Sequence, residues 1–313
     1  MISKKVFFWV INIIIIIAAI LIIKIKFFPT LLSEPFVHSS CAISVGVDNI
    51  WLADYTQYVY QFDQKGKVIN KFQAGANPSS VIAFAGYLAC TQDQALSVIR
   101  TSDSTVNAIQ VGTRPVASTW DGANVWVANQ NSDNISVVDD VLWKNINTFT
   151  VGYTPSSLAF DGTYIWVALT REGKVALINR GNYNISKLPV GGSGNLPMKV
   201  CADPSKKFVF VLNSTSTLQK LTINGVEDTI DLPESQYTSV ASDGKTAYVG
   251  DVAGILRFFD IATGKMTLDP ISFGGIISDI AVDSTYVYVF SNSSTIFKSY
   301  NKTSGDLAIN FNL

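Results

Sequence analysis

A pattern of about forty residues that recurs seven times constrains this chain more than any other feature. Its centre is a large side chain among apolar residues, as in Val125-Trp-Val-Ala-Asn129 and Ile165-Trp-Val-Ala-Leu169. These central side chains recur at intervals of 37 to 44 residues and are Trp51, Leu88, Trp126, Trp166, Phe210, Tyr248 and Tyr288. A repeat of this length is typical of architectures in which each unit buries its apolar surface against its neighbours.

Each repeat contains four short segments of β-forming residues. They are an apolar run such as Ser157 to Phe160, the aromatic segment after the Asp161-Gly162 turn, an alternating run such as Ile135 to Val138, and a fourth run such as Asn147 to Val151. Such runs, bounded by Gly, Asn, Asp or Ser, indicate strands. Four strands in forty residues match a propeller blade, whereas a β-sandwich has no fixed period and a leucine-rich solenoid has a shorter one. We therefore predict an all-β fold over residues 38–313, a seven-bladed β-propeller of four-stranded blades.

Two repeats resemble a known family. Val125-Trp-Val-Ala-Asn129, the following Asn134-Ile-Ser-Val-Val-Asp139, and the turns Val111-Gly-Thr-Arg-Pro115 and Val151-Gly-Tyr-Thr-Pro155 are similar to the YVTN-type β-propeller repeats of archaeal and bacterial surface proteins. The related lactonase-like and NHL-type propellers are also similar. The likeness covers repeats three and four well and the other repeats loosely. It implies a propeller fold and a surface location but no activity, because one fold serves many functions.

The last repeat contains all four of its own strands, so the ring has no spare strand with which to close. The only other candidate for a closing strand is Phe27 to Val37, and Pro29 and Pro35 argue against a central strand there. We therefore expect blades one and seven to meet through side-chain packing.

The N-terminus contains an apolar run, Val6 to Ile23, interrupted only by Asn12 and flanked by two lysines on each side. As a helix it would extend roughly 27 Å, enough to cross a bilayer core. We predict a membrane anchor over residues 1–27 and a linker over 28–37. A cleaved signal peptide and a buried helix are the alternatives, but the run is long for a signal peptide and no small-residue cleavage site follows it. Because two lysines flank each side of the run, the positive-inside rule gives almost no preference for either orientation of the helix in the membrane. We expect a single pass through the cell membrane with the propeller outside.

The outside location agrees with five N-glycosylation acceptor triplets, which begin at Asn134, Asn184, Asn213, Asn292 and Asn301. The repeat alignment places each of them in a loop or in an outermost strand. Three cysteines, Cys41, Cys90 and Cys201, lie in separate repeats and are expected to be buried apolar residues. One disulfide with a spare thiol is the alternative outside the cell.

Polar residues follow the aromatic strand in several repeats. They are Asp54, Asn129, Asn213, Asp251 and Ser291. In a propeller, the loops from strand two to strand three and from strand four to strand one share one face, so these residues predict either a polar ring at the mouth of the central channel or caps on strand ends.

One position in the first strands departs from the repeat. Lys199 and Asp279 align with Ser157, whereas the other aligned residues are small or apolar, namely Ala42, Val81, Ala117 and Ser239. A buried charge requires a partner, and the two blades are separated by only one other. We predict a Lys199 to Asp279 pair or a polar patch near the channel, the alternative being that both side chains reach solvent.

Charge, histidine content and missing motifs exclude several classes of function but do not identify one. The net charge is -1, with 23 basic and 24 acidic residues, so nucleic acid is not an expected partner. The single histidine, His38, excludes sites that need two, and no phosphate-binding loop or nucleophile elbow is present. No cofactor is expected beyond the divalent cation of lactonase-like propellers, for which Asp54, Asp251, Asp279 and Asn129 are the candidate ligands.

We predict a non-catalytic binding module for a surface protein, a glycan or a membrane-complex subunit. Its binding residues would be Asp54, Asn129, Lys199, Asn213, Asp251 and Asp279. One alternative is a lactonase-like hydrolase. Another is a structural subunit whose helix packs in a membrane assembly, for which Asn12 within the helix is a sign.

Overall fold

In the computed structural model the chain divides into two units, Met1–Pro35 and Phe36–Leu313. The structure describes residues 38–39, 42–46, 48–190, 194–205 and 207–313. The predicted anchor and linker lie outside these residues. In the part of the chain that is described, no helix has the length and apolarity that crossing a bilayer requires.

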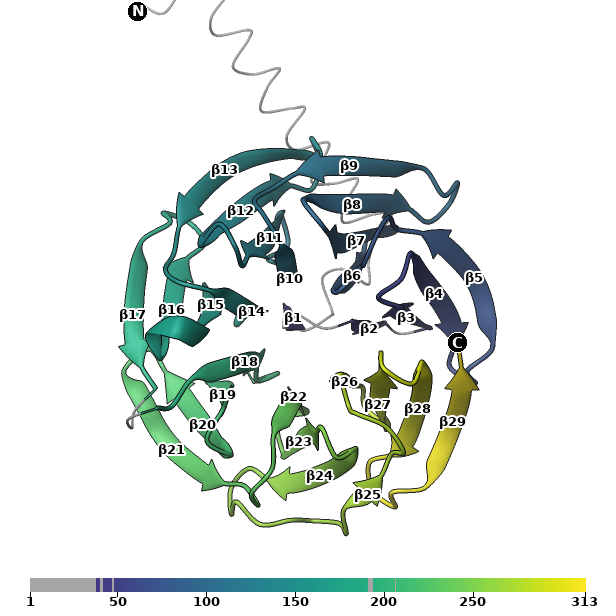
Figure 1. The fold of residues 1–313 in the computed structure, drawn as a ribbon, viewed down its shortest axis with the longest axis vertical. Coiled ribbons are helices and arrows are strands. Elements are labelled where there is room, and N and C mark those ends of the chain that lie inside the picture. Colours follow the sequence, from purple (N-terminus) through teal and green to yellow (C-terminus); the bar gives the residue numbers. More distant parts are fainter. Residues whose placement is uncertain (1–37, 40–41, 47, 191–193, 206) are drawn as a thin grey trace, which may run out of the picture. The chain divides into compact units, whose positions relative to one another are not determined.

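The second unit is a ring of seven antiparallel sheets (Figure 1), each built on four blade strands as the repeat predicts, and one sheet has a fifth strand. Blade 1 consists of β2 (Ile43–Val45), β3 (Asn49–Ala53), β4 (Tyr58–Asp63) and β5 (Val68–Gln73). Blade 2 consists of β6 (Val81–Phe84), β7 (Tyr87–Gln92), β8 (Ala95–Arg100) and β9 (Val106–Gln110). Blade 3 consists of β10 (Pro115–Trp120), β11 (Asn124–Asn129), β12 (Asn134–Asp139) and β13 (Lys144–Thr150). Blade 4 consists of β14 (Pro155–Phe160), β15 (Tyr164–Leu169), β16 (Lys174–Asn179) and β17 (Ile185–Pro189), with a short 3-10 helix, η2 (Thr170–Glu172).

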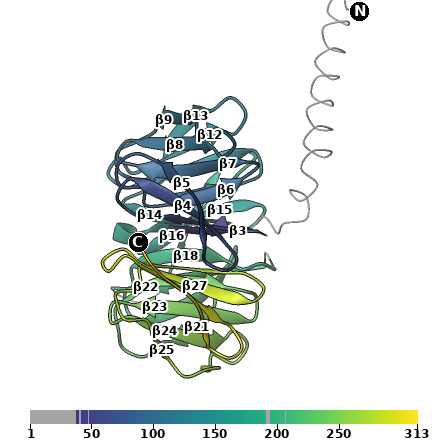
Figure 2. The ribbon, with the colours of Figure 1, turned by 90° about the vertical axis from the view of Figure 1, so that its right-hand side faces the viewer.

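The remaining three blades follow the same order. Blade 5 consists of β18 (Pro197–Ala202), β19 (Val209–Asn213), β20 (Thr217–Thr222) and β21 (Gly225–Asp231). Blade 6 consists of β22 (Tyr237–Ser242), β23 (Thr246–Asp251), β24 (Ile255–Asp260) and the short β25 (Ile271–Ser272). Blade 7 consists of β26 (Asp279–Val282), β27 (Tyr286–Ser291), β28 (Ile296–Asn301) and β29 (Leu307–Asn312). The first strand of each blade lies innermost, and Figure 2 shows the ring edge-on.

The two faces of the propeller carry different connections. We call one the loop face; it carries the connections from strand four to strand one, such as residues 111–114, and from strand two to strand three, such as residues 130–133. The other, the turn face, carries the strand one to two and strand three to four turns, such as residues 121–123 and 140–143.

The predicted repeat centres form the core between blades. All seven side chains are at most 7% exposed, and Trp126, Trp166, Tyr248 and Tyr288 are among the largest fully buried groups. Each of these four side chains also makes a hydrogen bond that the repeat alignment did not show. Each donates to an aspartate five residues earlier, as Trp126 Nε1 does to Asp121 Oδ2 at 2.8 Å. The same aspartate accepts backbone amides of its turn, so one carboxylate holds both the turn and the core aromatic.

The ring closes by packing, as expected. No strand of blade 7 pairs with blade 1 among the described residues, and each blade is built from its own strands. Phe62 of blade 1 packs on Phe297 and Phe311 of blade 7 at ring distances of 5.1 Å. The Tyr288 hydroxyl also bonds to Gln64 across the seam, at 3.2 Å.

One strand lies outside the blade pattern. β1 (His38–Ser39) pairs antiparallel with the inner edge of β14, with His38 opposite Phe160 and Ser39 opposite Ala159. Because Phe160 ends β14 at the turn face, β1 begins at that face and runs toward the loop face. β1 therefore lies against the inner edge of blade 4, whereas β2, the next strand in the chain, belongs to blade 1 (Figure 1).

Three of the glycosylation candidates are not where the alignment placed them. Asn134 and Asn301 lie in third strands, and Asn213 is a buried second-strand residue that is 1% exposed. Asn213 donates to Gln219 and Thr217, so the fold has no room for a glycan there. Asn184 and Asn292 are exposed and lie in loops, as predicted.

The described cysteines match the expected apolar role. Cys90 and Cys201 are free and buried, in blades 2 and 5. Burial raises the pKa of the Cys90 thiol, which therefore stays protonated. Cys41 lies outside the described residues.

Candidate functional site

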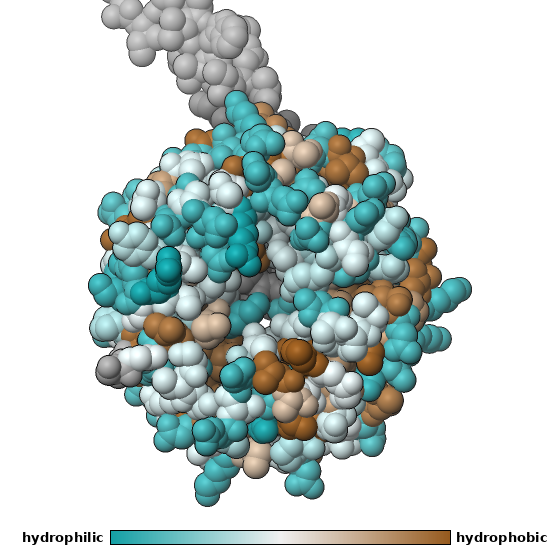
Figure 3. Space-filling model, viewed as in Figure 1, coloured by the Kyte–Doolittle hydropathy of each residue, from teal (hydrophilic) through white to brown (hydrophobic). Residues whose placement is uncertain are grey.

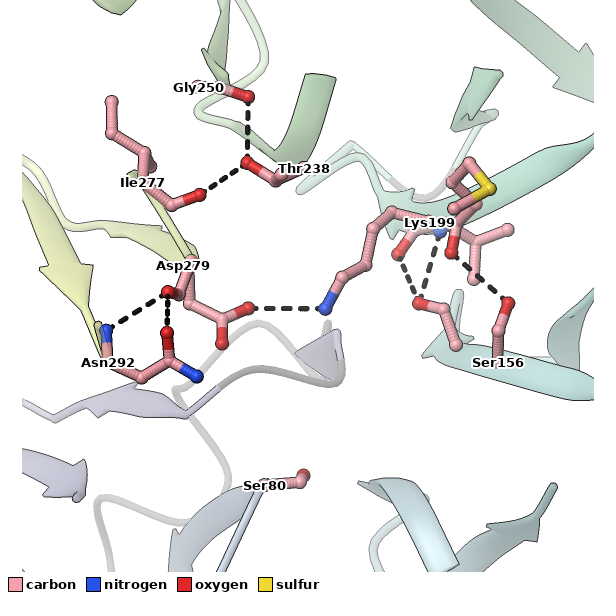
Figure 4. Close-up of polar contacts among 12 residues, drawn as sticks. Ser80, Ser156, Lys199, Thr238, Gly250, Ile277, Asp279 and Asn292 are labelled. Carbon is pink, nitrogen blue, oxygen red and sulfur yellow. Dashed lines mark hydrogen bonds and ion pairs between the residues drawn. The ribbon is translucent and has the colours of Figure 1, made fainter. Parts of the chain in front are cut away.

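The predicted pair of Lys199 and Asp279 is present at the centre of the loop face. Lys199 extends from β18 of blade 5 past blade 6, and its Nζ lies 3.2 Å from Asp279 Oδ1 on β26 of blade 7 (Figure 4). Asp279 is only 2% exposed, whereas the Lys199 side chain is 26% exposed. Since a buried carboxylate requires compensation, the lysine stabilises a charge that the ring otherwise encloses.

A third group completes this cluster and was not predicted. Tyr55, in the loop between β3 and β4, donates from its hydroxyl to Asp279 Oδ2 at 2.8 Å. Its ring stacks on Phe290 of blade 7 at 6.2 Å. We call Tyr55, Lys199 and Asp279 the central cluster; it joins blades 1, 5 and 7. In the sequence Tyr55 is one loop tyrosine among twelve tyrosines, and no local pattern sets it apart.

Asp54 contributes to the central cluster indirectly. Its carboxylate accepts the backbone amides of Thr56, Gln57 and Tyr58 and the Thr56 hydroxyl, so it fixes the loop in which Tyr55 stands. Tyr55 itself has a left-handed backbone, with φ 59°. A non-glycine residue in that conformation needs such support from its surroundings.

The other predicted loop-face residues cap strand ends inside their own blades. Asn129 donates to Asn134 and Ser136, and Asn213 donates to Thr217 and Gln219. Both asparagines are at most 1% exposed. The polar ring predicted at the channel mouth is therefore not what these side chains form.

Asp251 is also engaged internally. It accepts the Ile255 amide, the Ser235 hydroxyl at 2.8 Å and Arg257 Nη1 at 2.6 Å, and it is fully buried. Burial opposes its ionisation, but the hydrogen bonds, led by that of Arg257, outweigh burial and lower the pKa of Asp251. This carboxylate is an internal anion held by an internal cation.

Hydroxyl groups around the central cluster bind the blades to one another. Ser156 Oγ donates to the Met198 carbonyl in the next blade, and Thr238 Oγ1 donates to the Ile277 carbonyl (Figure 4). Within blade 7, Ser278 Oγ donates to Asn292 Oδ1 at 2.7 Å. These bonds pair several polar groups around the central cluster with other groups of the protein.

Apolar side chains are exposed beside this polar centre. The exposed ones on the loop face of blades 5 to 7 are Leu196, Met198, Val252 and Ile276, at 38 to 41%. Figure 3 shows the loop face hollowed at its centre, with hydrophobic surface beside the hollow. Among the residues that the structure describes, no group of three or more His, Cys, Asp and Glu side chains could hold a metal ion.

The fold is similar to solved propeller structures. A chain of Kuenenia stuttgartiensis hydrazine synthase superposes with a TM-score of 0.70 at 15% identity, covering 84% of this chain and 95% of that chain. The computationally designed protein Ika8 superposes with a TM-score of 0.65 at 12% identity, covering 87% of this chain and 86% of that chain. No protein-family model and no curated protein matches the sequence. The fold and these similarities define the class, a seven-bladed β-propeller, and the YVTN-type resemblance stays a prediction.

Proposed function

We propose that this chain is a membrane-anchored propeller, exposed outside the cell, that binds another surface protein through its loop face without catalysis. The observation that carries this proposal is the pairing of the central polar groups with one another while apolar side chains beside them are exposed. A surface of this kind gains binding energy from apolar contacts, and its paired charges fix the geometry of the partner.

The exposed apolar side chains belong to three consecutive blades, 5 to 7. Leu196 directly precedes blade 5 and Met198 lies in its first strand. Val252 follows β23, and Ile276 precedes blade 7. The backbone of this part is tightly bonded, since the Ile277 amide donates to the Asp251 carbonyl at 3.1 Å and the Val252 amide donates to the Gln236 carbonyl at 3.0 Å. A surface that is already ordered loses little conformational entropy when a partner binds.

The test is co-purification of the full chain from native membranes after mild cross-linking, with the bound proteins identified by mass spectrometry. Met198→Glu and Val252→Glu place a charge in the proposed contact and should each lower partner recovery at least about ten-fold, since a desolvated unpaired charge costs more than 1.4 kcal/mol. Thr229→Glu, at an exposed residue in the middle of the outer strand β21 and away from both faces, is the control. Equal recovery from all variants and the unsubstituted chain would reject the loop face as the binding surface.

The outside location has its own test. A membrane-impermeant amine reagent applied to intact cells should label exposed lysines of the propeller, such as Lys65, without prior permeabilisation. Labelling only after permeabilisation would place the propeller inside.

A further inference from the structure

The turn face carries an apolar surface that the proposed function does not use. Every blade exposes at least one large apolar side chain in its last turn or at the start of its outer strand. We call this set the apolar rim; it consists of Ile69, Val106, Val141, Leu142, Ile146, Ile185, Ile223, Val226, Met266 and Leu307. Scattered exposed apolar residues are ordinary, but a set that recurs at one end of all seven blades defines a face.

The most prominent part of the apolar rim is the turn between β12 and β13. Val141 and Leu142 at its tip are 56% and 61% exposed. Trp143 follows them and is partly exposed, with its ring 4.9 Å from Tyr87 and 6.1 Å from Phe84. Tryptophan and tyrosine beside exposed aliphatic residues are typical of protein surfaces at the boundary between lipid headgroups and acyl chains.

The backbone of this turn is satisfied within the protein. Asp139 Oδ1 accepts the amides of Val141 at 2.9 Å and Leu142 at 2.6 Å. The Trp143 amide donates to the Asp139 carbonyl at 3.0 Å, and the Asp140 amide donates to the Ala123 carbonyl at 3.2 Å. A tip that enters an apolar medium must not carry unpaired amides, because each would cost several kcal/mol there. The four amides of this tip meet that condition.

The start of β1 lies on the same face of the propeller as the apolar rim. β1 begins at the turn face, so covalent continuity joins the preceding residues to the propeller there. The predicted linker, residues 28–37, reaches at most about 35 Å when fully extended. A propeller tethered by so short a segment at its turn face has that face within reach of the bilayer.

We infer that the apolar rim around Val141, Leu142 and Trp143 rests on the lipid bilayer, so that the turn face meets the membrane and the loop face points away from it. The apolar rim contacts the interfacial layer of the bilayer, and apolar contacts rather than charge attraction hold the propeller there. This inference rests on the membrane anchoring in the proposed function. It adds a fixed orientation, in which the loop face is presented to partners.

The experiment uses the full chain in phosphatidylcholine vesicles, with Trp9→Phe to silence the tryptophan of the predicted anchor. Lipids brominated near the headgroup end of the acyl chain should quench roughly one fifth of the emission, the share of one tryptophan among the remaining five. Adding Trp143→Phe should abolish this quenching. A matched control carries Tyr153→Trp in the same background; Tyr153 is 63% exposed on the loop face, and a tryptophan there should not be quenched.

The outcomes separate the two proposals. If the full chain does not float with the vesicles, the anchoring fails and this inference fails with it. If the chain floats but Trp143 is not quenched, the anchoring in the proposed function stands and the lipid contact is wrong, which leaves the apolar rim to a protein partner. Equal quenching at position 153 and at Trp143 would show that the propeller has no fixed orientation, and would also overturn the inference.

Discussion

The bond between each core aromatic and its turn aspartate allows a direct test of what stabilises a blade. Trp126 is fully buried, packs on Tyr183 with the rings 5.7 Å apart, and donates to Asp121, which is itself 3% exposed. Trp126→Phe keeps most of the apolar contact but leaves one carboxylate oxygen without this donor. A hydrogen bond to a charged group contributes about 1.5–3 kcal/mol, so this loss adds to the cost of the smaller ring. Trp126→Ala should cost about 3–5 kcal/mol or more, because a cavity also forms.

Blade 1 provides the matched control. Trp51 occupies the equivalent position and is 7% exposed, but Gly46 stands where the aspartate would be. Trp51→Phe therefore removes a similar volume without breaking the bond to an aspartate. The free energy of unfolding, measured by guanidinium denaturation with far-ultraviolet circular dichroism, should fall by about 1.5–3 kcal/mol more for Trp126→Phe than for Trp51→Phe. Equal losses in the two variants would refute a stabilising role for the aspartate.

Three further predictions concern acid, thiols and the seam. Burial opposes the ionisation of Asp243, but hydrogen bonds led by that of Lys302 outweigh burial and lower the pKa of Asp243 from 3.8 to about 2. The stability that the ionised carboxylate contributes is therefore present above pH 3.8 and is lost toward pH 2. Over this range the melting temperature should fall more in the unsubstituted chain than in Asp243→Asn. In a Cys41→Ser chain, Cys90 and Cys201 should resist a thiol reagent until the fold is denatured, and rapid labelling of the native protein would contradict their burial. Since none of the described strands crosses the seam, hydrogen exchange should show blade 1 or blade 7 opening at lower free energy than blades 3 and 4, and uniform protection would reject a weak seam.

The fold could be predicted from the sequence because the same four-strand pattern recurs seven times. A single apolar run such as Val209–Asn213 fits a strand or a buried helix segment, but seven aligned copies leave one architecture. The positions aligned with Ser157 confirm the register, since Ser157 pairs with Ala168 and Lys199 with the equivalent Leu212. β1 was not predicted, because two residues carry no periodicity.

The candidate site was harder to predict, because a polar residue at a strand end can either line the channel mouth or cap the strand, and the sequence looks the same in both cases. Asp54 and Asn129 both follow an aromatic strand, and both prove to bond within the next turn. Only the fold shows that Asp54 supports Tyr55, whose partner Asp279 is 224 residues away along the chain. Long-range pairs of this kind leave no local pattern unless a residue breaks the repeat, as Lys199 does.

The charges of the central cluster are poorly explained by stability alone, and this leads to a final prediction. Replacing a buried ion pair by apolar residues is often neutral or stabilising, whereas removing one partner is costly. Lys199→Met removes one of the two groups that contact the Asp279 carboxylate in the described residues, and should destabilise the propeller by about 1–3 kcal/mol, a cost moderated by the solvent that reaches Lys199. Adding Asp279→Leu removes the buried charge and should restore most of that loss. If the double variant is as stable as the unsubstituted chain but recovers less partner from native membranes, the pair serves recognition; if it is less stable than Lys199→Met alone, the pair holds the ring together instead.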